Sequence, residues 1–266
     1  MTLMNALRGA AIAVIALIAV APAVQADVLD DVRKAKKIRI AIDFGVPPYG
    51  MTDDKMQPAG SDVDTARMLA KDWGMELEIV PTTGASRIPS LQTGKADLVI
   101  STLSITAERA KVIDFSVPYA TLRTVLVGTK SQAVKDVNDL TGKTVGTTRG
   151  TTHDTWLANN AKNAKIVRYE DDATTAQAFV SGQVDLFTTA ELLVAPIAAK
   201  NPARQLELKF PLEIFKLAVG VKKDEKRLLA EVDAWVKANL KNGKLNEIYK
   251  KHHGHDLPAE VVAAGS

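Results

Sequence analysis

The chain has 266 residues, of which 46% are hydrophobic and 24% are charged, and it contains no cysteine. This composition is typical of a globular protein with one large domain or two small ones. A formal net charge of +3 is too small for the strongly basic surface that nucleic acid binding requires, so we expect no nucleic acid partner. Disulfides are excluded, and a chain of this length does not need them to fold.

The first 26 residues have the pattern of a secretory signal peptide. A basic start that includes Arg8 precedes an apolar run over 9–21, and the residues VQA at 24–26 suit cleavage before Asp27. A membrane anchor is the alternative, but a spanning helix needs about 20 apolar residues and this run is shorter. After cleavage, residues 27–266 contain 33 Lys and Arg residues against 31 Asp and Glu residues. Because the signal peptide directs export, we expect the protein in a bacterial periplasm.

From residue 27 onward, strand patterns and helix patterns alternate along the chain. A predicted helix over 61–74 has apolar residues at helical spacing and ends at a glycine, and the segment 224–252 predicts one or two amphipathic helices. Short apolar runs predict strands at 37–43, 76–81, 96–101, 123–129, 184–189 and 215–221. This alternation indicates an α/β fold with largely parallel sheets.

The predicted strands divide into two systems of similar size. We expect a discontinuous first lobe over 27–120 and 216–266, with an inserted second lobe over 121–215. The chain would then cross between the lobes near 119–124 and near 210–217, and these two strands would form a hinge. A cleft between two lobes is a preferred place for a ligand.

A polar loop directly follows the strand predicted at 96–101. Its sequence, STLSITAER over 101–109, places hydroxyl side chains and an arginine behind an apolar run. In open α/β sheets, ligands bind at the carboxyl ends of the strands. The loop is therefore the first candidate for a binding site.

Four segments resemble the polar amino-acid solute-binding proteins of ABC importers, which are the bacterial extracellular solute-binding protein family 3. The segments are GSDVDTARMLA, RIPSLQTGKADLVISTLSITAERAKVIDFSVPY, LTGKTVGTTRGTT and GQVDL, and they stand in the order and spacing of that family. The resemblance implies a two-lobed periplasmic binding protein type II fold, in which each lobe is a mainly parallel sheet flanked by helices. It also implies a two-strand hinge that closes on a small zwitterionic ligand, which is then delivered to a membrane permease.

In that resemblance, Arg109 is the residue that holds the α-carboxylate of the ligand. A guanidinium is permanently charged and presents parallel donors that match the two oxygens of a carboxylate. Thr102 and Ser104 occupy the family positions whose backbone and hydroxyl groups complete this contact. The alternative is a surface ion pair of Arg109 with Glu108 or Asp114.

The resemblance adds two further groups to the site. Gly150 permits a sharp turn, and Thr151 or Thr152 can cap the helix that follows, whose free N–H groups attract anions. Thr152 falls where the family contacts the same carboxylate from the second lobe, and a plain helix cap is the alternative. Arg87 matches an arginine that binders of acidic amino acids use for the side-chain carboxylate, which would give the ligand a second anionic or strongly polar group.

Three departures from the family pattern bear on the ligand, and one is that TTGAS over 82–86 stands where the family has an aromatic side chain that stacks on the ligand. Ala190 stands where the family has a carboxylate for the ligand ammonium, with Glu191 beside it. Burying an ammonium without a partner costs several kcal/mol, so either Glu191 moves into the site or the ligand is not an ordinary α-amino acid. Val46 stands where relatives often have an aromatic side chain, for which Phe44 or Tyr49 could substitute.

The predicted function is capture of a polar amino acid or related small carboxylate by a monomeric periplasmic protein, which needs no cofactor and serves an ABC permease. The alternative is an enzyme like cyclohexadienyl dehydratase, which resembles this family in fold and uses a buried carboxylic acid as a general acid. Glu191 would take that role, with Arg109 and Arg87 as carboxylate clamps. The histidines of KHHGHD (251–256) are expected in a solvated tail rather than at a metal site.

Overall fold

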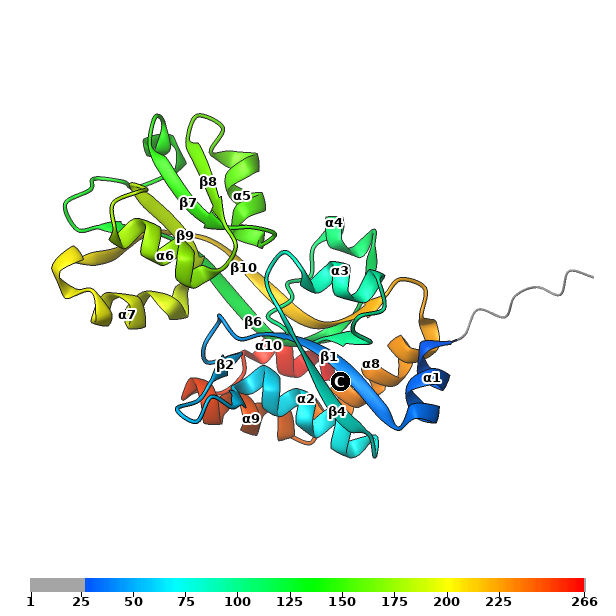
Figure 1. Cartoon of the computed structure of the whole chain (residues 1–266). Helices are drawn as coiled ribbons and strands as arrows, with labels where there is room; N and C mark the ends of the chain where they lie inside the picture. The colour runs from blue at the N-terminus through cyan, green and yellow to red at the C-terminus, as the bar shows by residue number, and fades with distance from the viewer. Residues whose placement is uncertain (1–26, 266) are drawn as a thin grey trace, which may run out of the picture.

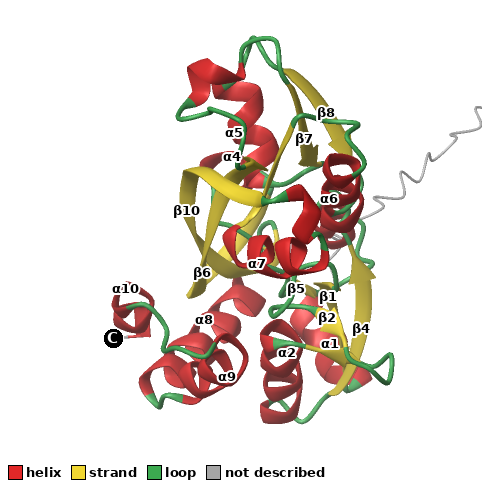
Figure 2. Cartoon of the chain, turned by 90° about the vertical axis from the view of Figure 1, so that its left-hand side faces the viewer, coloured by secondary structure: helices red, strands yellow, loops and turns green. Residues whose placement is uncertain are grey.

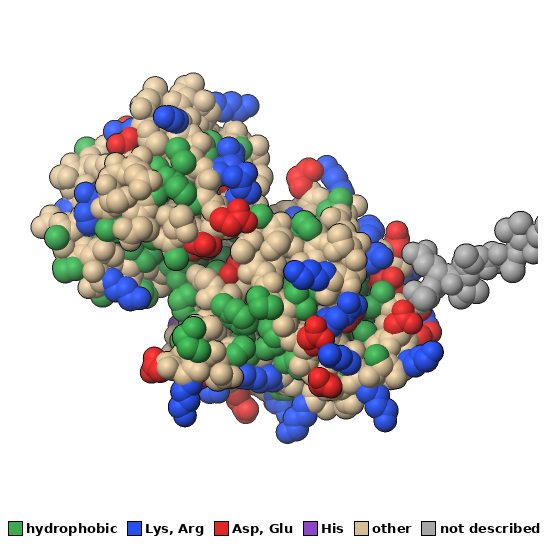
Figure 3. All heavy atoms as spheres, viewed as in Figure 1, with side chains coloured by type: hydrophobic (Ala, Val, Ile, Leu, Met, Phe, Trp, Pro, Cys, Tyr) green, Lys and Arg blue, Asp and Glu red, His purple; other side chains and the backbone are tan. Residues whose placement is uncertain are grey.

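The computed structural model describes residues 27–265, so the predicted signal peptide at 1–26 lies outside the described residues. Two lobes make up the described chain, and both of its ends belong to the same lobe (Figure 1). We call this body lobe 1 and the other lobe 2. Charged side chains are spread over both lobes, and the surface narrows to a waist between them (Figure 3). The predicted two-lobed α/β architecture is confirmed.

One mixed sheet runs through both lobes in the order β4-β1-β5-β10-β6-β9-β7-β8. In lobe 1, β4 and β5 lie parallel to β1, and in lobe 2, β8 and β9 lie parallel to β7. The parallel arrangement therefore holds within each lobe, while β6 and β10 add an antiparallel part. The strands are β1 (Lys37–Asp43), β4 (Glu76–Thr82), β5 (Leu98–Val99), β6 (Ile113–Thr129), β7 (Thr144–Thr148), β8 (Lys165–Tyr169), β9 (Leu186–Ala190) and β10 (Leu206–Lys222), with β2 (Met51–Thr52) and β3 (Pro58–Ala59) in a separate small sheet.

The two long strands β6 and β10 join the lobes. Each has 17 residues, and they pair with one another along their length, from Ile113 opposite Lys222 to Thr129 opposite Leu206. The sequence pattern predicted only the second half of each strand. The predicted lobe boundaries at 120/121 and 215/216 fall inside these strands and stay a prediction, because a continuous strand has no break at which a lobe ends.

Helices cover both faces of each lobe. In lobe 1 the largest apolar core lies between the sheet and α1, α2, α8 and α9, and a smaller core lies under α3. In lobe 2, α6 and α7 pack on one face of the sheet and α5 packs on the other. Figure 2 shows α2, α8 and α9 of lobe 1 grouped together at the bottom of the view. The helices are α1 (Val28–Ala35), α2 (Ser61–Asp72), α3 (Arg87–Gln92), α4 (Ala107–Ala110), α5 (Thr152–Asn160), α6 (Asp172–Val180), α7 (Glu191–Lys200), α8 (Lys226–Lys241), α9 (Lys244–His253) and α10 (Ala259–Val262).

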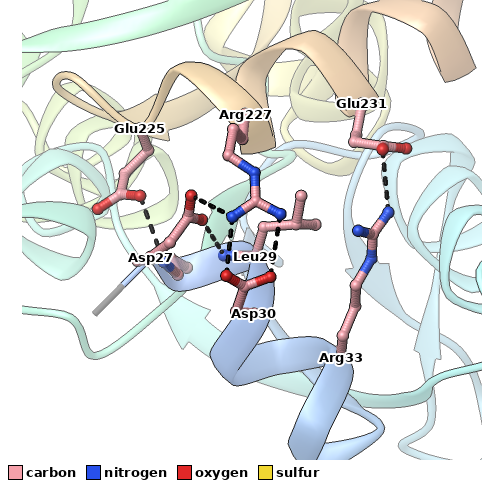
Figure 4. A network of polar contacts seen from close by, with 8 residues as sticks. Asp27, Leu29, Asp30, Arg33, Glu225, Arg227 and Glu231 are labelled. Carbon is pink, nitrogen blue, oxygen red and sulfur yellow. Dashed lines mark hydrogen bonds and ion pairs between the residues drawn. The ribbon is translucent and has the colours of Figure 1, made fainter. Parts of the chain in front are cut away.

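The first described residues attach α1 to α8. The carboxylate of Asp27 caps α1 by accepting a hydrogen bond from the Leu29 N–H at 2.9 Å. Arg227 of α8 donates to Asp27 at 2.9 Å and to Asp30 at 2.7 Å (Figure 4). Leu29 is buried in the core of lobe 1. The segment that directly follows the predicted cleavage point is thus an ordered part of lobe 1.

Of the C-terminal histidines, His252 and His253 lie half-buried in α9 rather than in the expected solvated tail, whereas His255 follows the helix and is exposed. His253 belongs to α9, stacks on Tyr249 with ring centroids 3.9 Å apart, and lies 3.1 Å from the Ser61 hydroxyl. Burial lowers the pKa of His253 to about 4, so its ring is neutral at neutral pH. Within residues 27–265, no group of three or more His, Cys, Asp or Glu side chains is placed to hold a metal ion. No helix of the same range is long and apolar enough to cross a membrane.

Candidate ligand-binding site between the lobes

A cavity of about 20 Å³ lies where the two lobes face each other, and both lobes contribute to its wall. Its lobe 1 side comes from the end of β1, the loop after β5 and the start of α3. Its lobe 2 side comes from the loop after β7, the start of α6 and the end of β9. The lining residues are Asp43, Val46, Gly84, Arg87, Thr102, Ser104, Leu122, Thr151, Thr152, His153, Asp172 and Ala190.

The sheet topology explains why these residues converge. Asp43 ends β1, Thr102 and Ser104 follow β5, Thr151 follows β7, and Ala190 ends β9. All four strands belong to the parallel parts of the sheet, and the carboxyl ends of parallel strands are where open α/β sheets bind ligands. Of the predicted site residues, Arg87, Thr102, Ser104, Thr151 and Thr152 line this one cavity.

Arg87 is a buried cation that forms no ion pair within residues 27–265, although the charges of Asp43 and Asp172 act on it. The residue is 4% exposed, and its Nη1 donates to the carbonyl oxygens of Ser101 at 2.7 Å and Thr102 at 3.3 Å. Its Nε has no hydrogen-bond partner in the described part of the chain. Burial lowers the pKa of Arg87. A buried guanidinium is costly unless a negative charge accompanies it, so the cavity favours an anionic group beside Arg87.

Thr102 takes an unusual backbone conformation in the cavity wall. Its φ of 43° lies in the left-handed region, which is rare for a β-branched residue and costs on the order of 1–3 kcal/mol. The carboxylate of Asp62 accepts hydrogen bonds from the Thr102 N–H and from the Tyr119 hydroxyl, each at 2.8 Å. Burial raises the pKa of Asp62 to about 6. This buried carboxylate thus supports the backbone that turns the Thr102 carbonyl toward Arg87.

Two carboxylates, one from each lobe, face the cavity. Asp43 accepts a hydrogen bond on Oδ1 from the Gly45 N–H at 2.8 Å. Asp172, the first residue of α6, keeps some accessible surface at the cavity although protein atoms surround its carboxylate closely. Burial and the negative charge of Asp43 raise the pKa of Asp172 to about 7. Burial also raises the pKa of Asp43, with a smaller contribution from the charge of Asp171.

His153 is a neutral side chain held in the cavity wall. It lies in the first turn of α5, is 4% exposed, and neither of its ring nitrogens has a hydrogen-bond partner among the described residues. Burial, with the positive charges of Arg87 and Arg109, lowers the pKa of His153 to about 3. The neutral imidazole therefore offers a ligand one donor and one acceptor.

Arg109 lies at the edge of the cavity rather than in its wall. Its Nη1 donates to the carbonyl oxygen of Ser104 and its Nη2 to that of Gly150, both at 3.0 Å. Because Ser104 lies in lobe 1 and Gly150 in lobe 2, this guanidinium joins the two lobes. Arg109 also lines a neighbouring pocket of about 300 Å³ together with Thr152. Its predicted contact with a ligand carboxylate stays a prediction.

The alternative partners of Arg109 are engaged elsewhere. Glu108 pairs with Lys111 at 2.7 Å, and Asp114 pairs with Lys223 at 2.6 Å. The surface ion pair that the sequence left open for Arg109 is therefore absent from the described residues.

Thr151 and Thr152 mark the start of α5. The hydroxyl of Thr151 accepts a hydrogen bond from the Asp154 N–H at 3.2 Å and donates to the Thr148 carbonyl at 2.6 Å. Thr151 is thus the helix cap, and Thr152 is the first residue of the helix. Both side chains line the cavity, so the helix start faces it.

Phe44 and Glu191 do not line this cavity. Phe44 packs partly buried against the core of lobe 1. The Glu191 carboxylate lies 3.3 Å from Arg123, and both residues line a separate groove of about 610 Å³ between α7, α9 and the long strands. The geometry therefore places the carboxylate of Glu191 away from the group of residues around Arg87.

Two glycines allow the lobes to approach closely beside the cavity. A Cβ atom on Gly84 would lie 3.0 Å from the Arg149 carbonyl oxygen and 3.1 Å from the Thr151 methyl group. A Cβ atom on Gly150 would lie 2.8 Å from the Cα atom of Ala85. A side chain at Gly150 would repel Ala85 strongly, and one at Gly84 would make tight contacts that require its neighbours in lobe 2 to move by a few tenths of an ångström.

Sequence reasoning missed three acidic residues of the site. Asp172 lies in the first turn of a helix, where acids are common because they stabilise the helix dipole. Asp62 lies in the first turn of α2 and has the same ordinary explanation. Asp43 could have been found, since a charged residue that ends an apolar strand at the ligand-binding edge of a sheet is a direct signal.

The fold and the cavity define a two-lobed binding protein of the type II periplasmic class. The chain matches the model of bacterial extracellular solute-binding proteins, family 3, over residues 38–255, and it belongs to this family. Members of this family are solute-binding proteins rather than enzymes.

Individual relatives agree with this assignment. The chain is 31% identical to the ABC transporter glutamine-binding protein GlnH of Bacillus subtilis over 239 residues, which cover 88% of this chain and 87% of that protein. It is 27% identical to the L-cystine-binding protein TcyJ of Escherichia coli over 249 residues, which cover 93% and 94% of the two chains. The ancestral amino acid-binding protein AncCDT-1, a precursor of cyclohexadienyl dehydratase, matches with a TM-score of 0.74 and 33% identity, covering 84% of this chain and 98% of its own.

Proposed function

We propose that this protein captures an amino acid in the cavity between its lobes and delivers it to the membrane permease of an ABC importer. Its relatives include binding proteins for glutamine and cystine, and its fold is that of this family. The protein works as a monomer in the periplasm, after loss of residues 1–26, and requires no cofactor.

The unpaired guanidinium of Arg87 carries this proposal. It is buried in the wall of a cavity, its Nε lacks a partner in the described residues, and its hydrogen bonds there go to Ser101 and Thr102 rather than to a carboxylate. A carboxylate ligand would supply the missing charge through charge-assisted hydrogen bonds. The nearby hydroxyls of Thr102, Ser104 and Thr152 offer further donors at the same wall.

Binding is coupled to closure of the lobes in this proposal. The cavity of about 20 Å³ has room for about one water molecule, so the lobes must separate before an amino acid can enter. They then close on the ligand to an arrangement more open than this one, which the ligand stabilises because it contacts both lobes only there. Arg109, bonded to both lobes, and Thr152, at the start of α5, provide the contacts that favour closure.

The dehydratase alternative has less support. The predicted general acid, Glu191, lies outside the cavity and pairs with Arg123. The ancestral match is itself an amino acid-binding protein. Turnover of prephenate or arogenate by the purified protein would favour the enzyme instead.

A binding experiment on an Arg87 variant tests the proposal. The twenty standard amino acids and L-cystine are screened by thermal shift on refolded, ligand-stripped protein, and the affinity of each hit is measured by calorimetry. Arg87→Gln should weaken binding about 100-fold or more, since the buried anion loses its partner. Arg168→Gln is the matched control, because Arg168 pairs with Asp154 on the surface of lobe 2. No shift with any of these amino acids, or equal affinity for Arg87→Gln and wild type, would overturn the proposal.

A further inference from the structure

Asp172 presents one carboxylate oxygen to the cavity. Its Oδ1 accepts hydrogen bonds from the hydroxyls of Thr148 at 3.1 Å and Thr189 at 3.4 Å. In the described part of the chain no donor is bonded to Oδ2, and no cation pairs with this carboxylate. Both threonines belong to strands of lobe 2, so the position of Asp172 is fixed by its own lobe.

Asp43 faces the same space from lobe 1. Its Oδ1 is bonded to the Gly45 N–H and its backbone N–H to the Ser101 hydroxyl, and it also has no cationic partner at ion-pair distance in the described range. The charges of Asp43 and Asp172 act on one another across the lobes. Two carboxylates from opposite lobes therefore converge where Ala190, at the end of β9, offers only a methyl group.

Charges of both signs surround the cavity. Arg87, Asp43, Asp172 and the neutral His153 line it, and Arg109 lies at its edge. The charge of Arg87 acts on both acids, but a ligand with carboxylate groups alone would engage Arg87 and add negative charge beside them. Buried charges without partners are strongly unfavourable, so the complementary ligand carries a positive group as well as a negative one.

We propose that Asp172, together with Asp43, binds the ammonium group of the ligand, so that the site selects zwitterionic amino acids and rejects carboxylates that lack an amino group. This inference rests on the proposed capture function. It identifies the residues that bind the ligand ammonium, which the proposed function does not assign. Asp172 replaces an acid at position 190 by reaching the cavity from α6 rather than from the end of β9.

The protonation of the acids supports the same assignment. The pKa of Asp172 is raised to about 7 by burial and by Asp43, while Arg87 and the two threonine hydroxyls lower it less. An ammonium group beside it would lower this pKa, because an opposite charge favours the ionised form. Binding of an amino acid near pH 7 should therefore release protons, whereas binding of an amine-free carboxylate should not.

The test compares each amino acid with its hydroxy acid, in which a hydroxyl replaces the α-ammonium group. The probes are L-glutamine, L-arginine and any further amino acid that the thermal-shift screen finds, each paired with its own hydroxy acid. Wild-type protein should bind the amino acid about 100-fold more tightly than the hydroxy acid. Asp172→Asn should lose about 100-fold in affinity for the amino acid and discriminate less than about tenfold.

Two further variants keep the test specific. Asp171→Asn is the matched control, because Asp171 caps α6 through the Thr174 N–H and an asparagine oxygen keeps that bond. It should keep the discrimination of wild type and change affinity far less than Asp172→Asn does, because the charge of Asp171 makes only a small contribution at Asp43. Asp43→Asn should weaken amino acid binding in the same direction as Asp172→Asn. Calorimetry in buffers of different ionisation enthalpy should show proton release by wild type and less release by Asp172→Asn.

The outcomes separate the two proposals. If wild type binds an amino acid and Asp172→Asn binds it equally well, this inference is overturned while the capture function stands. Equal affinity of wild type for an amino acid and its hydroxy acid, or proton uptake on binding the amino acid, also overturns it. If neither the standard amino acids nor L-cystine bind wild type, the capture function fails and the inference fails with it.

Discussion

Two opposing demands meet at the side chain of Asp172. Binding a cationic ligand group requires that Asp172 is ionised. In the ligand-free protein, however, burial and the nearby charge of Asp43 make the ionised form unfavourable. Functional residues commonly cost stability in this way. The two effects can be separated by replacing the acid with its amide, which keeps the size of the side chain and an oxygen for the two threonine hydroxyls.

Asp172→Asn should stabilise the ligand-free protein at about pH 8 and change its stability little at about pH 4. The pKa of Asp172 rises from an ordinary value of 3.8 to about 7 on folding, so the folded state favours the protonated form. The stability that the protonated form of Asp172 contributes is fully present below the unfolded pKa, and it is lost as pH rises through the folded pKa. Because the amide does not ionise, we expect a gain of about 1–3 kcal/mol in the free energy of unfolding at the higher pH.

Urea unfolding at the two pH values measures this gain. Asp171→Asn, on the preceding residue, should show a much smaller pH-dependent difference from wild type, because the charge of Asp171 makes only a small contribution at Asp43. A gain of the same size at both pH values would mean that the effect has another origin than ionisation. A variant that is more stable yet binds amino acids poorly would also show that its loss of binding is not a loss of folding.

The elements that the sequence predicts well are those with simple apolar patterns. The strand at 37–43 was predicted with its bounds as found, and the strand predicted at 76–81 is one residue longer. The first halves of β6 and β10 were not predicted as strand. In β10 that half contains Pro211, its apolar residues alternate with charged ones such as Glu207 and Glu213, and none of residues 206–214 is fully buried. A partly exposed strand of this kind lacks the continuous apolar run by which a core strand is recognised.

The residues of the candidate site were also predicted only where their local sequence was unusual. The loop after β5 was predicted because hydroxyls and an arginine behind an apolar strand are unusual. His153 and Asp172 lie in first turns of helices, where polar residues are ordinary, and only the packing of lobe 2 against lobe 1 gives them a role. The position of Glu191 depends on the direction of α7, which local sequence does not determine.

Gly84 belongs to the loop between β4 and α3, and its lack of a side chain allows the lobes to meet there. Gly84→Ala should lower affinity for the amino acid about tenfold, because the added methyl group would press on the Arg149 carbonyl and the Thr151 methyl group across the cleft. The backbone of Gly84 does not have the positive φ that penalises alanine. The melting temperature of the ligand-free protein should therefore be nearly unchanged, and calorimetry together with thermal unfolding checks both expectations.

Gly142→Ala provides the converse control for Gly84→Ala. Gly142 has a φ of 75° and open space around its Cα atom, so alanine adds backbone strain without touching the other lobe. It should lower the melting temperature and leave affinity unchanged. If Gly84→Ala lowers stability without lowering affinity, the close approach at this loop does not serve closure.

For the molecule as a whole, the two long strands and the charges of the cavity act together. Strands β6 and β10 are the continuous connection between the lobes, so bending within them changes the distance between Asp43 and Asp172 without unfolding either lobe. Closing brings the two carboxylates toward each other, which costs free energy unless one of them takes up a proton or a cation lies between them. An ammonium group in the cavity would therefore lower the free energy of the closed arrangement.

The ligand-free protein should accordingly be more closed at about pH 5 than at about pH 8. At the lower pH, Asp172 is protonated because its pKa in the closed arrangement is about 7, and its repulsion with Asp43 is removed. Small-angle X-ray scattering should show a smaller radius of gyration at the lower pH, and a saturating amino acid should produce the same decrease at the higher pH. The double variant Asp43→Asn, Asp172→Asn should lose most of the pH response, because Asp62, whose pKa is about 6, still ionises but lies within lobe 1. An equal radius of wild type at both pH values would show that repulsion between these carboxylates does not control closure.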